Sequence, residues 1–107
     1  MLQANEKQRD GFDAGFQWAQ QSADYGQLER LVNYEHMDTL FDGGPSSAFS
    51  AGELLVAIIE GEDRPDRQSS DDFWSNLDGA GKQYDDAFVE GFIDGVNDFY
   101  KKVADEI

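Results

Sequence analysis

Four carboxylates recur at four-residue steps in the last quarter of the sequence: Asp86, Glu90, Asp94 and Asp98. On an α-helix this spacing places neighbouring side chains about 5–6 Å apart. Such a row attracts the lysine and arginine side chains of another molecule, because complementary charges steer association at long range. The solvated face of an ordinary amphipathic helix would carry the same pattern. The row by itself therefore leaves both interpretations open.

The segment Gly79-Ala-Gly-Lys82 has the residue types of a phosphate-binding loop but not its spacing. That motif requires a glycine where Asn76 stands, and a serine or threonine after the lysine, where Gln83 stands. We expect a turn between two helices at this segment instead.

Metal and catalytic sites are not predicted either. The acidic clusters at 63–66 and 71–72 lack the alternating oxygens and central glycine of a calcium loop. His36 is the single histidine and there is no cysteine, so neither a zinc site nor a Ser–His or Cys–His pair is indicated. With 23 acidic residues, some pair of carboxylates fits any spacing that acid–base catalysis requires, so such a pair is no evidence for an enzyme. We therefore predict a protein that is not an enzyme and uses no cofactor or metal.

The carboxylate row belongs to the most strongly predicted helix, residues 83–105. Lys101 and Lys102 fall in its last turn, where positive charge suits the helix dipole. Apolar residues recur at three- and four-residue steps on the opposite face, the helical period: Tyr84, Phe88, Phe92, Val96, Phe99 and Val103.

Further helices are predicted at residues 4–23, 27–41, 54–59 and about 69–77. Gly26 is expected to end the first of these, and Ser69 or Ser70 to cap the last. The run 54–59 is short enough to be a buried strand, but Ser50 and Glu53 have the capping-box spacing and favour a helix. The expected fold is all-α, a compact bundle of four or five helices with a long amphipathic C-terminal helix, in one domain spanning residues 1–107.

Two segments, 10–16 and 90–96, share a pattern of acid, Gly-Phe, two residues and a second glycine. Glycine weakens a helix by up to ~1 kcal/mol, so its repeated use indicates that another backbone must come close. We favour a crossing of the first and last helices at these glycines. The alternative is a self-association surface, and hence a homodimer.

Trp18 and Trp74 are candidates for apolar anchoring of a partner. Trp18 lies off the apolar stripe of its predicted helix, and Trp74 stands in an acidic, serine-rich stretch. Large aromatic residues ringed by charge are common interface anchors. A small domain also has several faces to fill, and burial in the core is the favoured interpretation for each tryptophan.

The net charge of −15, from 23 acidic and eight basic residues, is the strongest global feature. It would favour disorder, but eight Phe, four Tyr and two Trp supply a core. Direct binding of nucleic acid is excluded, since no basic stripe can neutralise phosphates. No apolar run reaches membrane-spanning length and the first ten residues are too polar for a signal peptide, so we expect a cytoplasmic protein.

In size, acidity, aromatic content and lack of cysteine, the chain resembles phage-encoded DNA-mimic inhibitors, the anti-CRISPR and anti-restriction proteins. The resemblance extends over the whole chain and rests on no diagnostic motif, so it transfers no functional residue. It implies an inhibitor that occupies the nucleic-acid-binding surface of a basic target, such as a CRISPR effector, in a bacterial cytoplasm.

The expected function is thus an acidic protein inhibitor that blocks nucleic-acid binding by a partner protein. An immunity protein or antitoxin that neutralises a basic toxin is an alternative, although the Tyr-Tyr-Pro element of bacteriocin nuclease immunity proteins is absent. A non-inhibitory acidic interaction domain, or adaptation to salt, is another. The residues expected at the partner interface are Asp86, Glu90, Asp94, Asp98, Glu60, Glu62, Asp63, Asp71, Asp72, Trp18 and Trp74.

Overall fold

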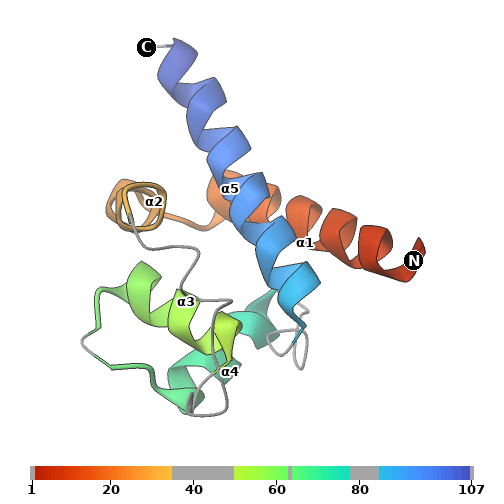
Figure 1. The fold of residues 1–107 in the computed structure, drawn as a ribbon. Helices are drawn as coiled ribbons and strands as arrows, with labels where there is room; N and C mark the ends of the chain where they lie inside the picture. Colours follow the sequence, from red (N-terminus) through yellow and green to blue (C-terminus); the bar gives the residue numbers. More distant parts are fainter. Residues whose placement is uncertain (1, 35–49, 63, 78–84, 107) are drawn as a thin grey trace.

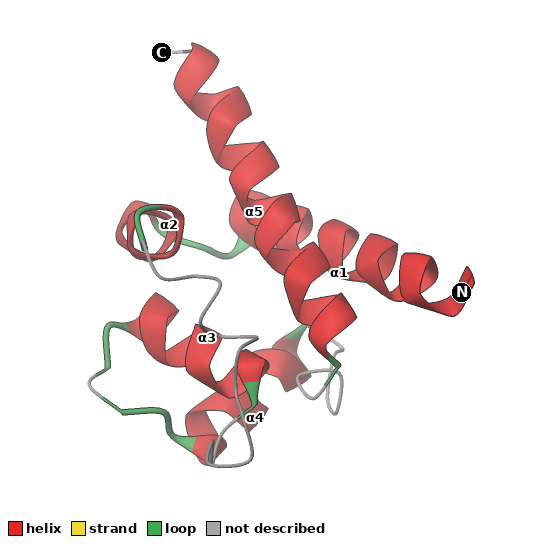
Figure 2. Cartoon of the chain, in the orientation of Figure 1, coloured by secondary structure: helices red, strands yellow, loops and turns green. Residues whose placement is uncertain are grey.

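The computed structural model describes residues 2–34, 50–62, 64–77 and 85–106 (Figures 1 and 2). All regular structure in these ranges is helical, and no strand occurs in them. The helices are α1 (Leu2–Gln21), α2 (Tyr25–Val32), α3 (Ala51–Glu60), α4 (Arg67–Asn76) and α5 (Asp86–Glu106). The prediction of an all-α bundle with a long last helix is confirmed.

The first and last helices, α1 and α5, cross at their glycines (Figure 1). All four glycines are buried, and a Cβ atom on any of them would overlap a carbonyl oxygen of the other helix. The glycines Gly11, Gly15, Gly91 and Gly95 face the carbonyls of Phe88, Phe92, Gln8 and Phe12, respectively. The predicted crossing is confirmed. The alternative of a self-association surface at these glycines is wrong, because the fold already buries them.

One core is shared by all five helices. Trp74 is fully buried in it, with its ring 5.0 Å from that of Phe92 between centroids. Its indole nitrogen donates to the carbonyl oxygen of Gly52 at 3.3 Å. Trp18 is only 5% exposed and packs 5.5 Å from Phe73 and 5.6 Å from Phe92. Both tryptophans are core residues, so the favoured interpretation of core burial is confirmed, and the alternative that they are exposed anchors at the partner interface is wrong.

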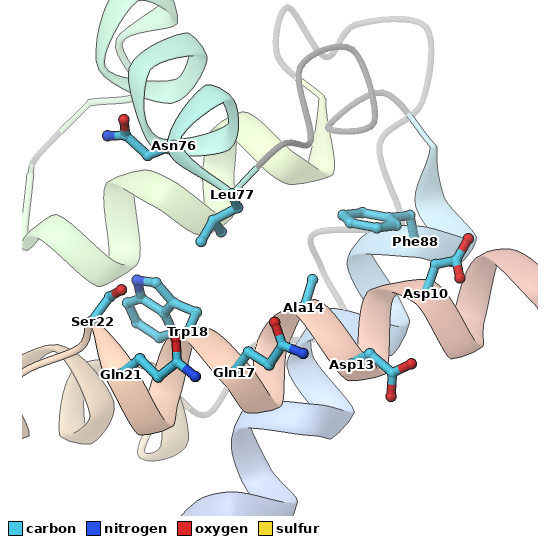
Figure 3. Close-up of a pocket in the computed structure, with 10 residues that line it drawn as sticks. All are labelled: Asp10, Asp13, Ala14, Gln17, Trp18, Gln21, Ser22, Asn76, Leu77 and Phe88. Carbon is cyan, nitrogen blue, oxygen red and sulfur yellow. The ribbon is translucent and has the colours of Figure 1, made fainter.

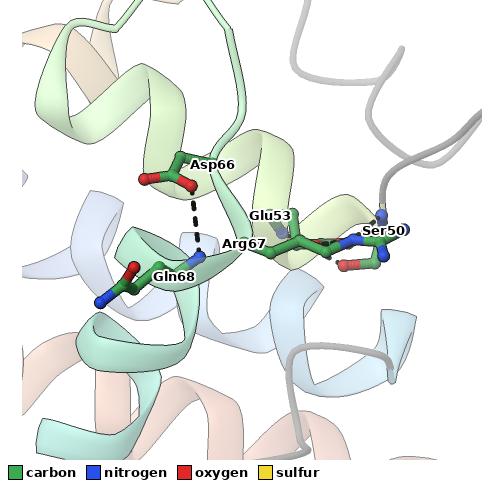
Figure 4. Close-up of polar contacts among 5 residues, drawn as sticks. All are labelled: Ser50, Glu53, Asp66, Arg67 and Gln68. Carbon is green, nitrogen blue, oxygen red and sulfur yellow. Dashed lines mark hydrogen bonds and ion pairs between the residues drawn. The ribbon is translucent and has the colours of Figure 1, made fainter.

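The N-terminus of α3 is fixed by the predicted capping box (Figure 4). The Ser50 hydroxyl accepts from the Glu53 N–H at 3.2 Å, and Glu53 Oε1 accepts from the Ser50 N–H at 2.8 Å. Glu53 Oε2 is buried without a hydrogen bond, but Arg67 Nε of α4 lies 3.3 Å away and balances its charge. Residues 51–60 are helical, which confirms the choice of helix over strand. As predicted, the helix is buried on most sides.

The C-terminus of α3 is tied to α2. Gly61 takes the left-handed conformation, with φ of 69°, that commonly ends a helix. Arg30 of α2 lies against it and donates from Nε to the carbonyl oxygen of Ile59 at 2.8 Å. This bond satisfies one of the carbonyls that a helix leaves free at its last turn.

Two helix starts differ from prediction. Asp24 caps α2 by accepting from the Gln27 N–H at 2.7 Å, so Gly26 lies inside α2 and does not end the preceding helix. Asp66, and not Ser69 or Ser70, caps α4 (Figure 4). In both cases an aspartate further upstream supplies the acceptor that the first turn needs.

Candidate functional site

The carboxylate row of α5 points away from α1 at its first three positions. Asp86, Glu90 and Asp94 are exposed and form no ion pair within the described residues. Asp98 is partly buried and lies 3.3 Å from Lys102, which neutralises it locally. With a rise of 1.5 Å per residue, the row extends about 18 Å and presents one carboxylate every ~6 Å.

A second group of predicted acids gathers beside α3 and α4. Glu60, Glu62 and Asp72 line a hollow of about 440 Å³ whose other walls are Ser69, Phe73 and Asn76. Folding therefore brings Asp72 of α4 beside Glu60 and Glu62 at the end of α3. The exposed Asp71 is on the same helix but does not line this hollow, and Asp63 lies outside the described residues.

A cleft of about 500 Å³ lies between α1 and α4 (Figure 3). Its apolar lining is Ala14, Trp18, Leu77 and Phe88. Its polar lining is Asp10, Asp13, Gln17, Gln21, Ser22 and Asn76. Because Asn76 also borders the α3–α4 hollow, the two depressions adjoin.

Asp10 and Asp13 are exposed functional candidates that the sequence interpretation missed. A signal was present, since Asp10, Asp13, Gln17 and Gln21 follow helical steps of three and four residues. Without the position of α4, nothing distinguishes that polar row from any other solvated helix face.

The ion pairs that basic side chains form within the described residues lie outside the α1–α4 cleft and the α3–α4 hollow. Lys7 contacts Asp85 at 2.7 Å, and the hydrogen bond from Lys7 lowers the pKa of that carboxyl below its usual value. Asp85 also accepts from the Ala87 N–H at 3.1 Å at the start of α5. Arg67 pairs with Glu53, as described above. Within the part of the chain that the structure describes, no ion pair reaches Asp10 or Asp13 of the α1–α4 cleft, and no basic residue lines either depression.

Within the described ranges, no three Asp, Glu, His or Cys side chains converge as metal ligands would. The same ranges contain no helix with the length and apolarity needed to cross a membrane. His36 and Lys82, considered above for catalysis and phosphate binding, lie outside them.

Comparison with protein-family models, with curated proteins and with solved structures finds no match for this chain, so its function has to be inferred from its own residues.

Proposed function

We propose that this protein is an acidic inhibitor that binds the basic, nucleic-acid-binding surface of a target protein and excludes the nucleic acid, in the manner of an anti-CRISPR protein. The observation that carries the proposal is that three carboxylates of the α5 row, Asp86, Glu90 and Asp94, are exposed and form no ion pair within the described residues, in a chain whose net charge is −15. A rigid helix holds these charges at fixed intervals, so binding does not have to order them first.

The charge density of the row sets a limit on this mimicry. One DNA strand presents a phosphate every 3.4 Å along the axis. The α5 row presents a carboxylate every ~6 Å, which is about half as dense. Asp98 is partly cancelled by Lys102, which lowers the effective charge further. A complete mimic therefore needs acids outside α5, and those of the α1–α4 cleft and the α3–α4 hollow are available.

The test begins with capture of partners from bacterial lysate on the immobilised protein at low salt, with elution by a salt gradient. We expect one nucleic-acid-binding protein or complex, because screening weakens an electrostatic interface as salt rises. The purified partner is then mixed with labelled nucleic acid and increasing amounts of inhibitor. Undiminished nucleic-acid binding at inhibitor excess contradicts the proposal, and recovery of a toxin domain favours an immunity protein.

A charge reversal assigns the interface. Glu90→Lys/Asp94→Lys on α5 should weaken partner binding at least about fivefold, since exposed ion pairs contribute ~0.2–1 kcal/mol each and reversal adds repulsion. The control Glu6→Lys/Glu106→Lys makes the same change in net charge on α1 and at the end of α5. Equal weakening by the two variants would remove the row from the interface.

A further inference from the structure

Tyr25, at the start of α2, is the most exposed large apolar side chain in the described ranges, with 62% of its surface exposed. Its ring lies 6.5 Å from that of Tyr100 on α5, between centroids, at an interplanar angle of 30°. The two side chains are hydrogen-bonded, and this bond, together with the nearby Glu29 carboxylate, raises the pKa of Tyr25 above its usual value. An exposed ring that is held in this way is a preorganised contact surface, because binding does not have to order it first.

A small apolar pocket of about 60 Å³ opens beside the two rings, between α2 and the last turns of α5. It is lined by Tyr25, Leu28, Tyr100, Val103 and Ala104, and we call it the Tyr25–Tyr100 pocket. Leu28 is buried and Val103 is partly buried, whereas Ala104 is exposed. The end of α5 extends away from the other helices (Figure 1), and within the described ranges only α2 and α5 line the pocket. Its size suits part of one side chain and not a larger ligand.

The charges beside the pocket indicate which side chain fits it. Glu29 follows Tyr25 by one helical turn, so the two side chains share a face of α2 and lie about 5–6 Å apart. Lys101 and Lys102 follow Tyr100 on α5, but Glu29 forms no ion pair within the described residues. Lys102 is instead paired on α5 itself and lies over a ring of α1. The pocket therefore combines an apolar wall, an exposed aromatic ring and a carboxylate without a cation.

We propose that the Tyr25–Tyr100 pocket binds an arginine side chain of the protein partner. The aliphatic stem enters the pocket against Leu28 and Val103, since such stems bury well while the charged end stays hydrated. The planar guanidinium lies over the exposed Tyr25 ring, whose face attracts a cation, and its N–H groups reach the Glu29 carboxylate. The inference rests on the proposed function only in taking the partner to be a basic protein.

Other occupants fit the pocket less well. Two copies of this chain repel each other, because each has a net charge of −15. A stable interface between copies also uses about 20–30 residues on each side, many more than line this pocket. A nucleic-acid base could stack on Tyr25, but its phosphates would meet the like charge of Glu29. Arginine supplies an apolar stem, a flat group and positive charge together, so it matches all three features of the pocket.

The tyrosine rings allow a test that needs no knowledge of the natural partner. The protein has four tyrosines, so a sample with ¹³C-labelled tyrosine rings gives a simple NMR spectrum. The probe is a capped Gly-Arg-Gly peptide, and its citrulline counterpart, at the same ionic strength, keeps the shape without the charge. We expect the arginine peptide to shift the Tyr25 and Tyr100 signals with saturation, and to bind about threefold to thirtyfold more tightly than the citrulline peptide. An unmoved Tyr25 signal, or equal affinity for the two peptides, overturns the proposal.

Two matched pairs of variants locate the site. Tyr25→Leu keeps an apolar side chain but removes the ring, and should weaken peptide binding about twofold to fivefold. Tyr34→Leu makes the same change at the other exposed tyrosine of the described ranges and should have little effect. Glu29→Gln should weaken binding by up to about fivefold, and Glu6→Gln, which removes the same charge on α1, should have a clearly smaller effect. Equal weakening within either pair overturns the proposed site.

Sedimentation of the protein alone at raised salt tests a second copy as the occupant, because salt screens the repulsion between copies. We expect a monomer, and a dimer that Tyr25→Leu disrupts would overturn the proposal. The peptide assay is independent of the displacement assay. A saturable arginine site in a protein that displaces no nucleic acid would refute the inhibitor proposal alone, and displacement by a protein whose Tyr25 signal does not move would refute this site alone.

Discussion

The crossing of α1 and α5 brings two helix backbones close together, and it predicts the effect of replacing a glycine there. In Gly11→Ala, the new Cβ atom would overlap the carbonyl oxygen of Phe88 and lie 2.9 Å from the amide nitrogen of Phe92. Both neighbours are backbone atoms of a helix, so neither can rotate away. The helices must separate, on the order of 1 Å, before the methyl group fits.

The magnitude follows from two opposed terms. Overpacking a close contact costs ~1–3 kcal/mol, and a gap of 0.5–1 Å elsewhere in the interface forfeits a quarter to a half of each contact's attraction. Alanine returns up to ~1 kcal/mol through its better helix propensity. We expect a net loss of about 2 kcal/mol from a total near 5–15 kcal/mol. In a domain of this size that lowers the midpoint of thermal unfolding by roughly 8–16 °C.

The matched control is the same substitution at an exposed helical glycine. A Cβ atom on Gly26 of α2 would have its nearest neighbour, Asp24 Oδ1, at 3.4 Å. Gly26→Ala should therefore stabilise by about 0.4–1 kcal/mol. Circular dichroism during heating and in urea measures both variants. If Gly11→Ala is as stable as Gly26→Ala, the backbone contact inferred between α1 and α5 is not present.

Three further perturbations test the ties between helices. Arg30→Ala removes the donor at the end of α3 and should cost about 1 kcal/mol in urea unfolding, whereas an unchanged urea midpoint would mean that water replaces this bond. Ser50→Ala removes the cap of α3 and should cost a similar ~1 kcal/mol, with Ser50→Asp keeping most of the stability. Because Lys7 lowers the pKa of Asp85, this pair stabilises the fold above the ordinary carboxyl pKa of 3.8 and its contribution is lost as pH falls through the lowered value. In Lys7→Ala the urea midpoint should therefore depend less on pH below about 5. The free energies of unfolding of the two proteins should differ by no more than ~1 kcal/mol, because Lys7 is exposed and Asp85 is only partly buried. The same pH dependence below about pH 5 in both proteins would contradict the pairing.

The features that were predictable from sequence are those in which one local pattern has one physical cause. Ser50 and Glu53 satisfy each other across a single turn, so the capping box predicted α3 without knowledge of the rest of the chain. The paired glycines predicted a backbone contact because a glycine inside a helix has a cost that packing must offset. Asp24 and Gln27 carried a similar capping signal, but Gly26 beside them also fitted a helix end and led to the wrong boundary.

The candidate site was less predictable because it depends on two neighbours at once. Trp18 lies off the main apolar stripe because it packs against two helices at once, Phe92 of α5 and Phe73 of α4. Periodicity analysis finds a single stripe and assigns a residue beside it to the surface. The cleft, with Asp10 and Asp13 on its wall, exists only once α4 is placed against α1.

The α1–α5 crossing also constrains how the chain reaches its fold. Each helix carries two glycines in its middle, which lowers its stability in isolation, and short isolated helices are marginal in water even without such residues. Their mutual support joins residues 2–21 to residues 86–106, so a loop of more than half the chain must close before either helix is secure. Such long-range contacts slow folding. During synthesis, α1 should therefore stay only partly helical until α5 has left the ribosome, and a cell making this protein has to protect its exposed Phe and Trp residues until then.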